Sequence, residues 1–416
     1  MDSGNLAWYL VAGAIVLFMT PGIAFFYGGM VKAKSVVSMM MMSFGAMGLV
    51  GVLWVLYGYN MGLMSPGEGN LIPGLLGNPF ADIGLSAMAS ADDNGTLLAV
   101  FYGATFAIAT TALVSGAIAD RARFGPWMLF AGIWVTLVYF PVQGWVWGFD
   151  ADGTPTGWIY ALGDTLGFST TTIDYAGGTA VHINAAAAAL ALALVLGKRI
   201  GFAKGAHQPH NVPLTLIGVA ILIVGWFGFN GGAAATAGFD GLGRIILNTF
   251  VAAAAGILGW VLVERAKDGK ATSIGAGSGA IAGLVAITPA CYSLTPGWSI
   301  LLGVIAGAVC AFAIELKYKL GFDDSLDVVA LHGIGGLIGC WFLGFFATDT
   351  GLLFSGNFEQ LIVQVIASTA VAIYSFGITW LIGTGIEKTI GFRVQNADEL
   401  AGVDVAQHGE DGYVLA

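Results

Sequence analysis

The chain divides into long apolar segments separated by short polar connections. A helix needs about 20 apolar residues to cross the hydrocarbon core of a bilayer, which is roughly 30 Å thick. Segments of about this length lie at 6–30, 35–61, 95–119, 125–148, 175–197, 212–232, 242–263, 273–290, 298–316, 328–347 and 360–386. The pattern predicts an all-α polytopic membrane protein with eleven transmembrane helices embedded in a lipid bilayer.

Basic residues follow only every second segment. Fourteen of the fifteen Lys and Arg residues lie after odd-numbered segments, and Arg244 is the exception. The fourteen are Lys32, Lys34, Arg121, Arg123, Lys198, Arg199, Lys204, Arg265, Lys267, Lys270, Lys317, Lys319, Lys388 and Arg393. Because Lys and Arg favour cytoplasmic connections, the N-terminus is predicted outside and the C-terminus inside. A wrong segment count would scramble this alternation, so it supports eleven helices independently of hydropathy.

Composition agrees with this class. Apolar residues make up 57% of the chain and charged residues 10%, and the mean hydropathy of +0.83 excludes an ordinary soluble domain. The net charge of −10 comes from acids in the outer connections and the C-terminal tail, so we expect no nucleic-acid partner. Cys291, Cys310 and Cys340 lie far apart in apolar segments, which predicts neither a disulfide framework nor a metal site.

Two histidines, His182 and His332, lie inside apolar segments. An ionisable side chain at bilayer depth costs at least roughly 2.5 to 3.5 kcal/mol, so it usually faces a cavity or a partner. The alternative is that each is a neutral imidazole hydrogen-bonded into helix packing. His207, His210 and His408 lie in polar stretches, and we expect no chemistry from them.

The segments also suggest an internal repeat of five helices. Phe25 to Gly29 ends the first segment, and the similar run Phe227 to Gly232 ends the sixth. His182 and His332 then occupy corresponding segments, preceded by Asp174 and Asp327 respectively. With an odd number of helices per unit the halves must be inverted, an arrangement that places substrate sites at the midplane.

We expect pseudo-repeats at about 6–198 and 212–347, an eleventh helix, and a cytoplasmic tail over 389–416. The transmembrane domain as a whole is expected to span 1–388. At 1.5 Å per residue, the two histidines could meet near the centre of the membrane.

Two neutral imidazoles that share a proton form a relay or bind a small neutral donor. They could not easily hold a hydrated cation, because stripping a monovalent ion into a low dielectric costs tens of kcal/mol by Born estimates. Paired intramembrane histidines can also be axial haem ligands. That alternative is disfavoured, because transmembrane electron transfer typically needs more than one facing pair.

Several stretches match those of a known family in order and spacing. They are Phe26 to Gly29, Gly116 to Arg121 with Arg123 and Phe124, Asp174 to Asn184, Gly225 to Asn230, and Asp327 to Gly333. Over essentially its whole length the chain resembles the Amt branch of the Amt/Mep/Rh ammonium transporter family. The resemblance implies a homotrimer with one narrow pore per subunit, running between the inverted repeats, without a cofactor and without enzymatic activity.

The resemblance also implies roles for individual residues. Trp147 and Phe106 would recruit ammonium at an outer vestibule, Phe106 and Phe229 would form a stacked gate, and His182 and His332 would form the twin-His pair. Asp174 would support the recruitment end of the pore, although it could equally be a plain helix N-cap. Where many relatives carry a serine that contributes a hydroxyl to the vestibule, this chain has Ala233.

The tail from Gly391 to Tyr413 resembles the family's cytoplasmic region, which packs beneath neighbouring subunits and helps to bind PII-type signalling proteins. Composition alone would favour a disordered acidic tail. The resemblance implies uptake of ammonium across the plasma membrane, with deprotonation at the gate and conduction of ammonia, with or without its proton. The alternative is an ammonium sensor with little flux, which would normally carry a longer tail or an output domain.

Overall fold

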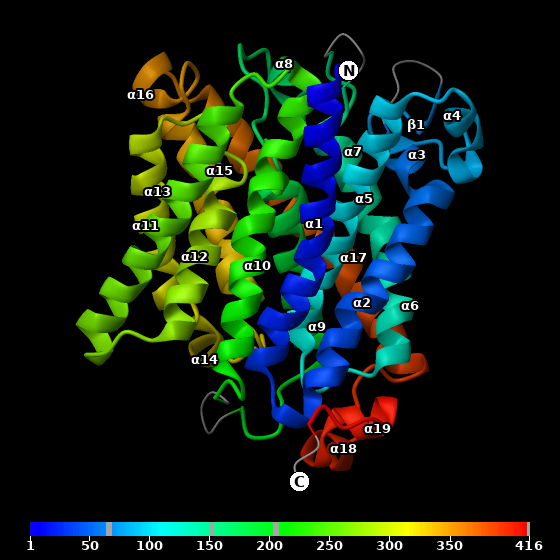
Figure 1. Cartoon of the computed structure of the whole chain (residues 1–416), viewed down its shortest axis with the longest axis vertical. Helices are drawn as coiled ribbons and strands as arrows, with labels where there is room; N and C mark the ends of the chain where they lie inside the picture. Colours follow the sequence, from blue (N-terminus) through cyan, green and yellow to red (C-terminus); the bar gives the residue numbers. More distant parts are fainter. Residues whose placement is uncertain (64–68, 150–153, 203–207, 414–416) are drawn as a thin grey trace.

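The computed structural model describes residues 1–63, 69–149, 154–202 and 208–413, and these form a bundle of long helices (Figure 1). Lys204 and His207 lie outside the described residues. The elements of the first half are α1 (Ser3–Met30), η1 (Ala33–Ser35), α2 (Val36–Leu53), η2 (Trp54–Gly58), α3 (Tyr59–Gly62), β1 (Asn70–Ile72), β2 (Leu76–Gly77), η3 (Ile83–Leu85), α4 (Ser86–Ser90), α5 (Asn94–Val114), η4 (Ser115–Ile118), α6 (Phe124–Trp134), η5 (Val135–Tyr139), α7 (Phe140–Trp147), α8 (Leu162–Leu166), η6 (Gly178–Ile183) and α9 (Asn184–Leu196).

The elements of the second half, within its described residues, are all helices. Its elements are α10 (Val212–Gly231), η8 (Gly232–Ala237), α11 (Leu242–Asp268), α12 (Ser273–Ile287), α13 (Pro296–Ala313), α14 (Leu316–Leu320), η9 (Val329–Ile334), α15 (Gly335–Phe346), α16 (Leu352–Ser355), α17 (Glu359–Thr389), α18 (Asn396–Ala401) and α19 (Val403–His408). The one sheet among the described residues is the antiparallel pair β1–β2.

Each of the eleven apolar segments forms a helix. Ten of these helices, within the described ranges, are long and apolar enough to cross a membrane. The remaining one, α12, has 15 residues, about 22 Å at 1.5 Å per residue, and nearly all of it is buried in the bundle. The all-α polytopic class is therefore confirmed, while eleven crossings and the orientation of the termini stay predictions.

Polar side chains mark where several of the helices begin. Asp2 accepts a hydrogen bond from Asn5 N at the head of α1, and Asn211 accepts one from Leu214 N at the head of α10. Asp93 and Thr272 cap α5 and α12 in the same way. Such caps satisfy backbone N–H groups that have no partner within the helix.

The two halves of the chain meet along α1 and α10, which run side by side in opposite directions (Figure 1). Asn211 N donates to Gly29 O at 3.0 Å, and Trp8 Nε1 donates to Gly231 O at 2.9 Å. At the crossing, a Cβ added to Gly218 would lie 2.2 Å from Phe26 N. Only glycine allows so close an approach, as small residues do generally between helices in lipid.

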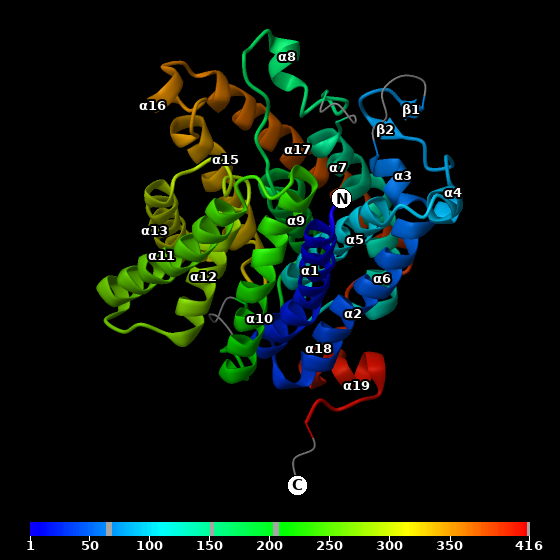
Figure 2. The same cartoon turned by 45° about the horizontal axis from the view of Figure 1, so that its top comes forward.

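The C-terminal tail is folded against the end of the bundle opposite the N-terminus (Figure 1), where α19 lies beside α2 (Figure 2). The Asp404 carboxylate in α19 accepts hydrogen bonds from Val37 N and Ser38 N, at 3.1 and 2.7 Å, and so caps α2. Glu399 in α18 is 1% exposed and accepts from Ile200 N. Up to Tyr413, the tail is therefore an ordered part of this face rather than a disordered acidic extension.

Candidate functional site

Both intramembrane histidines lie on π-helical turns that lead into longer helices. His182 belongs to η6, which continues into α9, and His332 belongs to η9, which continues into α15. A π-turn is wider than an α-turn and occurs frequently at functional sites. The two turns come from opposite halves of the chain and contact each other.

The structure brings the two imidazoles into direct contact. His332 Nδ1 lies 3.1 Å from His182 Nδ1, and the ring centroids are 5.2 Å apart. The side chains are 3% and 1% exposed respectively. One Nδ1 must carry a proton and the other must accept it, so the rings hold opposite tautomers. Nitrogens this close leave no space for an iron atom between them, which removes the geometric basis for bis-histidine haem ligation.

The Nε2 side of the His182 ring contacts a buried hydroxyl. His182 Nε2 lies 3.3 Å from Thr288 Oγ1, and the same oxygen accepts a hydrogen bond from Trp226 Nε1 at 2.8 Å. Thr288 Oγ1 also donates to Leu284 O at 2.7 Å. The Trp226 ring is stacked on His182, with centroids 5.6 Å apart. The position of the His182 ring is thus set by contacts on both of its nitrogens.

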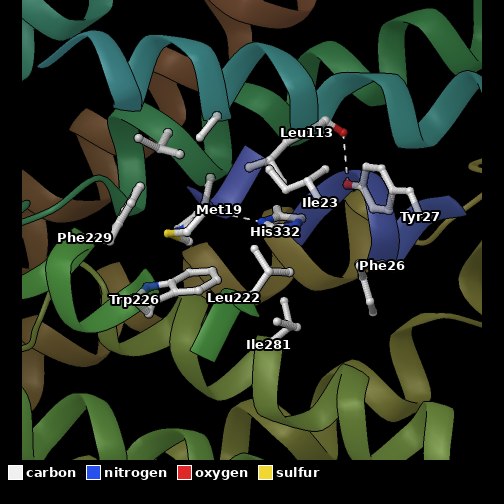
Figure 3. Close-up of a pocket in the computed structure, with 13 residues that line it drawn as sticks. Met19, Ile23, Phe26, Tyr27, Leu113, Leu222, Trp226, Phe229, Ile281 and His332 are labelled. Carbon is white, nitrogen blue, oxygen red and sulfur yellow. Dashed lines mark hydrogen bonds between the residues drawn. The ribbon is translucent and has the colours of Figure 1, made fainter. Parts of the chain in front are cut away.

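A small apolar cavity surrounds the pair. Its volume is about 20 Å³, and besides the histidines its lining is aliphatic and aromatic. Figure 3 shows His332 between Phe229 at one end and Phe26 with Tyr27 at the other. Because a cavity needs about 10 to 15 Å³ to admit one water molecule, this one has room for a single molecule of that size.

A stack of two phenylalanines separates this cavity from a larger one nearer the end of the bundle where the N-terminus lies, called the outer cavity. The Phe106 and Phe229 rings are stacked with centroids 4.1 Å apart and planes 23° from parallel. Phe229 lines both cavities, while Phe106, Trp147 and Ala233 line the outer one, whose volume is about 230 Å³. Tyr102 holds the stack, because its hydroxyl donates to Phe229 O at 2.7 Å and its ring contacts Phe106.

Trp147 lies beside this stack and is tied to the head of η6. Its ring meets Phe106 edge-on with centroids 5.9 Å apart, and its Nε1 donates to Asp174 O at 2.7 Å. The Asp174 carboxylate is buried and accepts four backbone hydrogen bonds of 2.6 to 3.0 Å, from residues 177–180. Asp174 therefore caps the turn that carries His182, and its carboxylate oxygens are directed at the backbone rather than at the cavity that Trp147 lines.

The residue equivalent to Asp174 in the second half is Asp324 rather than Asp327. Asp324 Oδ2 accepts from Val329 N at 2.7 Å at the head of η9. Asp327 has a positive φ of 61°, and its carboxylate pairs with Lys317 Nζ at 2.7 Å. Asp324 precedes His332 by eight residues, the same spacing that separates Asp174 from His182. The repeated eight-residue spacing is the sequence signal that could have identified Asp324 as the equivalent of Asp174.

Burial of Asp324 makes stability depend on pH. Desolvation, with the negative charge of Asp327, raises the pKa of Asp324 from 3.8 to about 6. A carboxyl with a raised folded-state pKa binds more protons when folded, so its contribution is fully present below about pH 4 and is lost as the pH rises through about 6.

Asp324→Asn should abolish this loss, roughly 2 to 3 kcal/mol, because the amide oxygen still caps Val329 N but cannot ionise. Melting temperatures in detergent from about pH 4 to 7 test the effect, with the exposed Asp164→Asn as control. Parallel pH curves for Asp324→Asn and the wild type would contradict the expectation.

Sequence reasoning missed Thr288, Trp226 and Tyr102 as members of the site. Trp226 lies inside a matching stretch, but its contact with Thr288 depends on the packing of α10 against α12. No local pattern distinguishes Thr288 from other hydroxyl residues in apolar helices. Among the described residues, no group of three or more His, Cys, Asp or Glu side chains could hold a metal ion.

Comparisons with known proteins relate the whole chain to one family. The family model described as Ammonium Transporter Family matches residues 7–413. The chain is 46% identical to an ammonium transporter of Mycobacterium tuberculosis, over 100% of this chain and 91% of that relative.

Two solved structures are also similar to the chain. Mep2 of Candida albicans has a TM-score of 0.84 at 33% identity, covering 99% of this chain and 91% of that one. A protein named Sensor Amt Protein has a TM-score of 0.85 at 27% identity, covering 97% and 98%. This chain therefore belongs to the Ammonium Transporter Family and is a multi-pass membrane transporter rather than an enzyme.

Proposed function

We propose that the protein takes up ammonium by conducting ammonia through the cavity that holds His182 and His332. The observation that carries this proposal is the contact between the two imidazoles in an apolar cavity with room for one small molecule. An unhydrated cation in such a cavity would cost tens of kcal/mol by Born estimates. Ammonia is neutral and close to water in size, so it suits the cavity where ammonium does not.

The outer cavity is the proposed recruitment site. Trp147 and Phe106 line it, and an aromatic face attracts a poorly hydrated cation by about 0.5 to 2 kcal/mol. The Phe106–Phe229 stack would then force dehydration and deprotonation, and ammonia would pass the histidines and be reprotonated inside. Ala233 contributes no hydroxyl to this cavity, so aromatic attraction carries more of the recruitment here.

Several features of the assembly are part of the same proposal. The basic end of the bundle with the ordered tail would face the cytoplasm, and the N-terminus would face outward across the plasma membrane. Residues 1–388 would form the transporter domain, with inverted repeats at about 6–198 and 212–347, and residues 389–416 the cytoplasmic tail.

We further propose a homotrimer whose tails present a surface for a PII-type signalling protein, in the service of nitrogen assimilation. The relative named ammonium transporter, 46% identical over the whole chain, favours flux over sensing.

The experiment is current on a solid-supported membrane after ammonium jumps, using proteoliposomes of the wild type and of His182→Ala with His332→Ala. We expect a wild-type current that depends on liposome density, and loss of that current or of its selectivity in the double variant. His210→Ala with His408→Ala, outside the pore, is the matched control. Equal, ammonium-selective currents in wild type and double variant would overturn the role of the pair, and uptake of labelled substrate without current would identify electroneutral ammonia conduction.

A further inference from the structure

The Thr288 hydroxyl is a junction of three hydrogen-bonding groups beside the histidine pair. Trp226 Nε1 can only donate, and it lies 2.8 Å from Thr288 Oγ1. Leu284 O can only accept, and the hydroxyl lies 2.7 Å from it. His182 Nε2, at 3.3 Å, can do either. All three contacts are buried.

Counting protons at this junction settles which partner donates. A hydroxyl has one proton to give and two lone pairs. The proton goes to Leu284 O, the shorter contact, and one lone pair accepts from Trp226. The remaining lone pair faces His182 Nε2, which must therefore carry a proton. His182 Nδ1 is then bare, and His332 Nδ1 carries the proton of the 3.1 Å contact between the rings.

The fourth ring nitrogen of the histidine pair, His332 Nε2, carries no proton as a result. Among the described residues, the ring of His332 is hydrogen-bonded only through Nδ1. Since His332 lines the small cavity (Figure 3), the pair presents a lone pair there, an acceptor for an N–H group.

We propose that Thr288 is a positioning residue that sets the tautomers of the histidine pair, and thereby makes His332 Nε2 the acceptor presented to ammonia. This inference rests on the proposed function and adds to it the chemistry of the group that meets the substrate. Were the hydroxyl to donate to His182 Nε2 instead, both rings would reverse, and His332 Nε2–H would be a donor to the cavity.

The tautomers of the histidine pair determine whether the pair can pass a proton. If a bare His182 Nε2 takes the proton from ammonium, His182 Nδ1 passes its proton to His332 Nδ1, and His332 Nε2 releases its proton to ammonia on the inner side. One proton enters and one leaves, and the pair ends with His182 Nε2–H and a bare His332 Nε2. That is the arrangement which Thr288 stabilises, and it has no lone pair at His182 Nε2 to take a second proton, so the Thr288 hydroxyl opposes repeated relay through the pair.

Solid-state NMR of the full-length protein in bilayers tests the tautomers directly, without a transport assay. His182 is the one histidine that follows a valine, and His332 the one that follows a leucine. Carbonyl-13C valine or leucine combined with 15N-histidine therefore selects each residue, and intraresidue correlations reach its ring nitrogens. In the wild type we expect protonated Nε2 and bare Nδ1 on His182, and the reverse on His332.

Three variants separate a positioning role from a purely structural one. Thr288→Ser keeps the hydroxyl and should keep the wild-type tautomers and the wild-type ratio of current to labelled uptake. Thr288→Val is nearly the same size but lacks the hydroxyl, so both tautomers should be populated and the ratio should change. Trp226→Phe removes the other donor to the hydroxyl and should leave the tautomers unchanged.

A bare His182 Nε2 in the wild type, or unchanged tautomers in Thr288→Val, would overturn the proposal. The wild-type measurement decides even if a variant fails to fold. Expected tautomers in a protein that shows no ammonium flux would instead refute the proposed function and leave the role of Thr288 standing.

Discussion

Asp174→Ala should lower the free energy of unfolding by about 3 to 5 kcal/mol and abolish ammonium transport. Four backbone N–H groups at the head of η6 lose the carboxylate that accepts their hydrogen bonds. Each unmade buried hydrogen bond costs about 1 to 3 kcal/mol, and partial rearrangement of the turn reduces the total. Because His182 lies on this turn, its contact with His332 is lost together with the cap.

Graded substitutions at Asp174 make this expectation specific. Asp174→Asn keeps one oxygen for two of the four N–H groups, so its loss should be intermediate. Asp164→Ala, in an exposed position of the connection between α7 and η6, should change nothing. Denaturant titration in detergent micelles measures stability, and ammonium-jump currents measure transport. Normal stability in Asp174→Ala would show that the four contacts are dispensable.

Arg199→Met should destabilise the protein by about 3 to 5 kcal/mol, the range for removing one partner of a buried ion pair. Arg199 Nη1 lies 3.0 Å from Asp120 Oδ2, and its Nη2 lies 2.9 Å from Asp323 Oδ1. Both carboxylates are fully buried, and Arg199 is 7% exposed. Methionine fills much of the volume but leaves two buried carboxylates without the guanidinium that pairs with both.

The matched control is the neighbouring Lys198→Met, because Lys198 is exposed. Burial by itself would raise the pKa of Asp323, but the hydrogen bond and charge of Arg199 outweigh it and lower that pKa below 3.8. A carboxylate with a depressed folded-state pKa stabilises the fold above its unfolded pKa, and this contribution is lost as the pH falls through the folded value. The wild type should therefore lose stability below about pH 4, and Arg199→Met should lose less there. Equal stabilities of the two Met variants at neutral pH would contradict the ion-pair argument.

The position of the ion pairs explains why this face is well ordered. Arg199 follows α9, and the next residue, Ile200, donates its N–H to Glu399 of the tail. Glu399 in turn pairs with Arg393, whose Nη1 donates to Leu196 O. The connection after the His182 helix is thus bound to the tail on one side and to the second half of the chain on the other.

The sequence by itself determined the membrane class and the approximate bounds of the helical segments, and it singled out two histidines inside them. Length and hydropathy are local properties, and the cost of an ionisable group in lipid can be read from one segment. For that reason His182 and His332 were singled out without coordinates, and the structure brings their rings into contact. Length and hydropathy do not fix whether α12 crosses the membrane, because a helix buried among other helices can be shorter than the hydrocarbon core is thick.

Only the tertiary structure decided which polar atoms meet. Phe106 and Phe229 come from different halves of the chain, and their stacking depends on how α5 and α10 pack. Asp324 caps η9 while Asp327 turns to Lys317, because the backbone at Asp327 adopts a positive φ. Thr288, at the end of α12, contacts His182 on η6, a turn far away in the sequence. Hydrogen bonds depend on tenths of an ångström and on direction, and those are set by packing of the whole bundle rather than by any local run of residues.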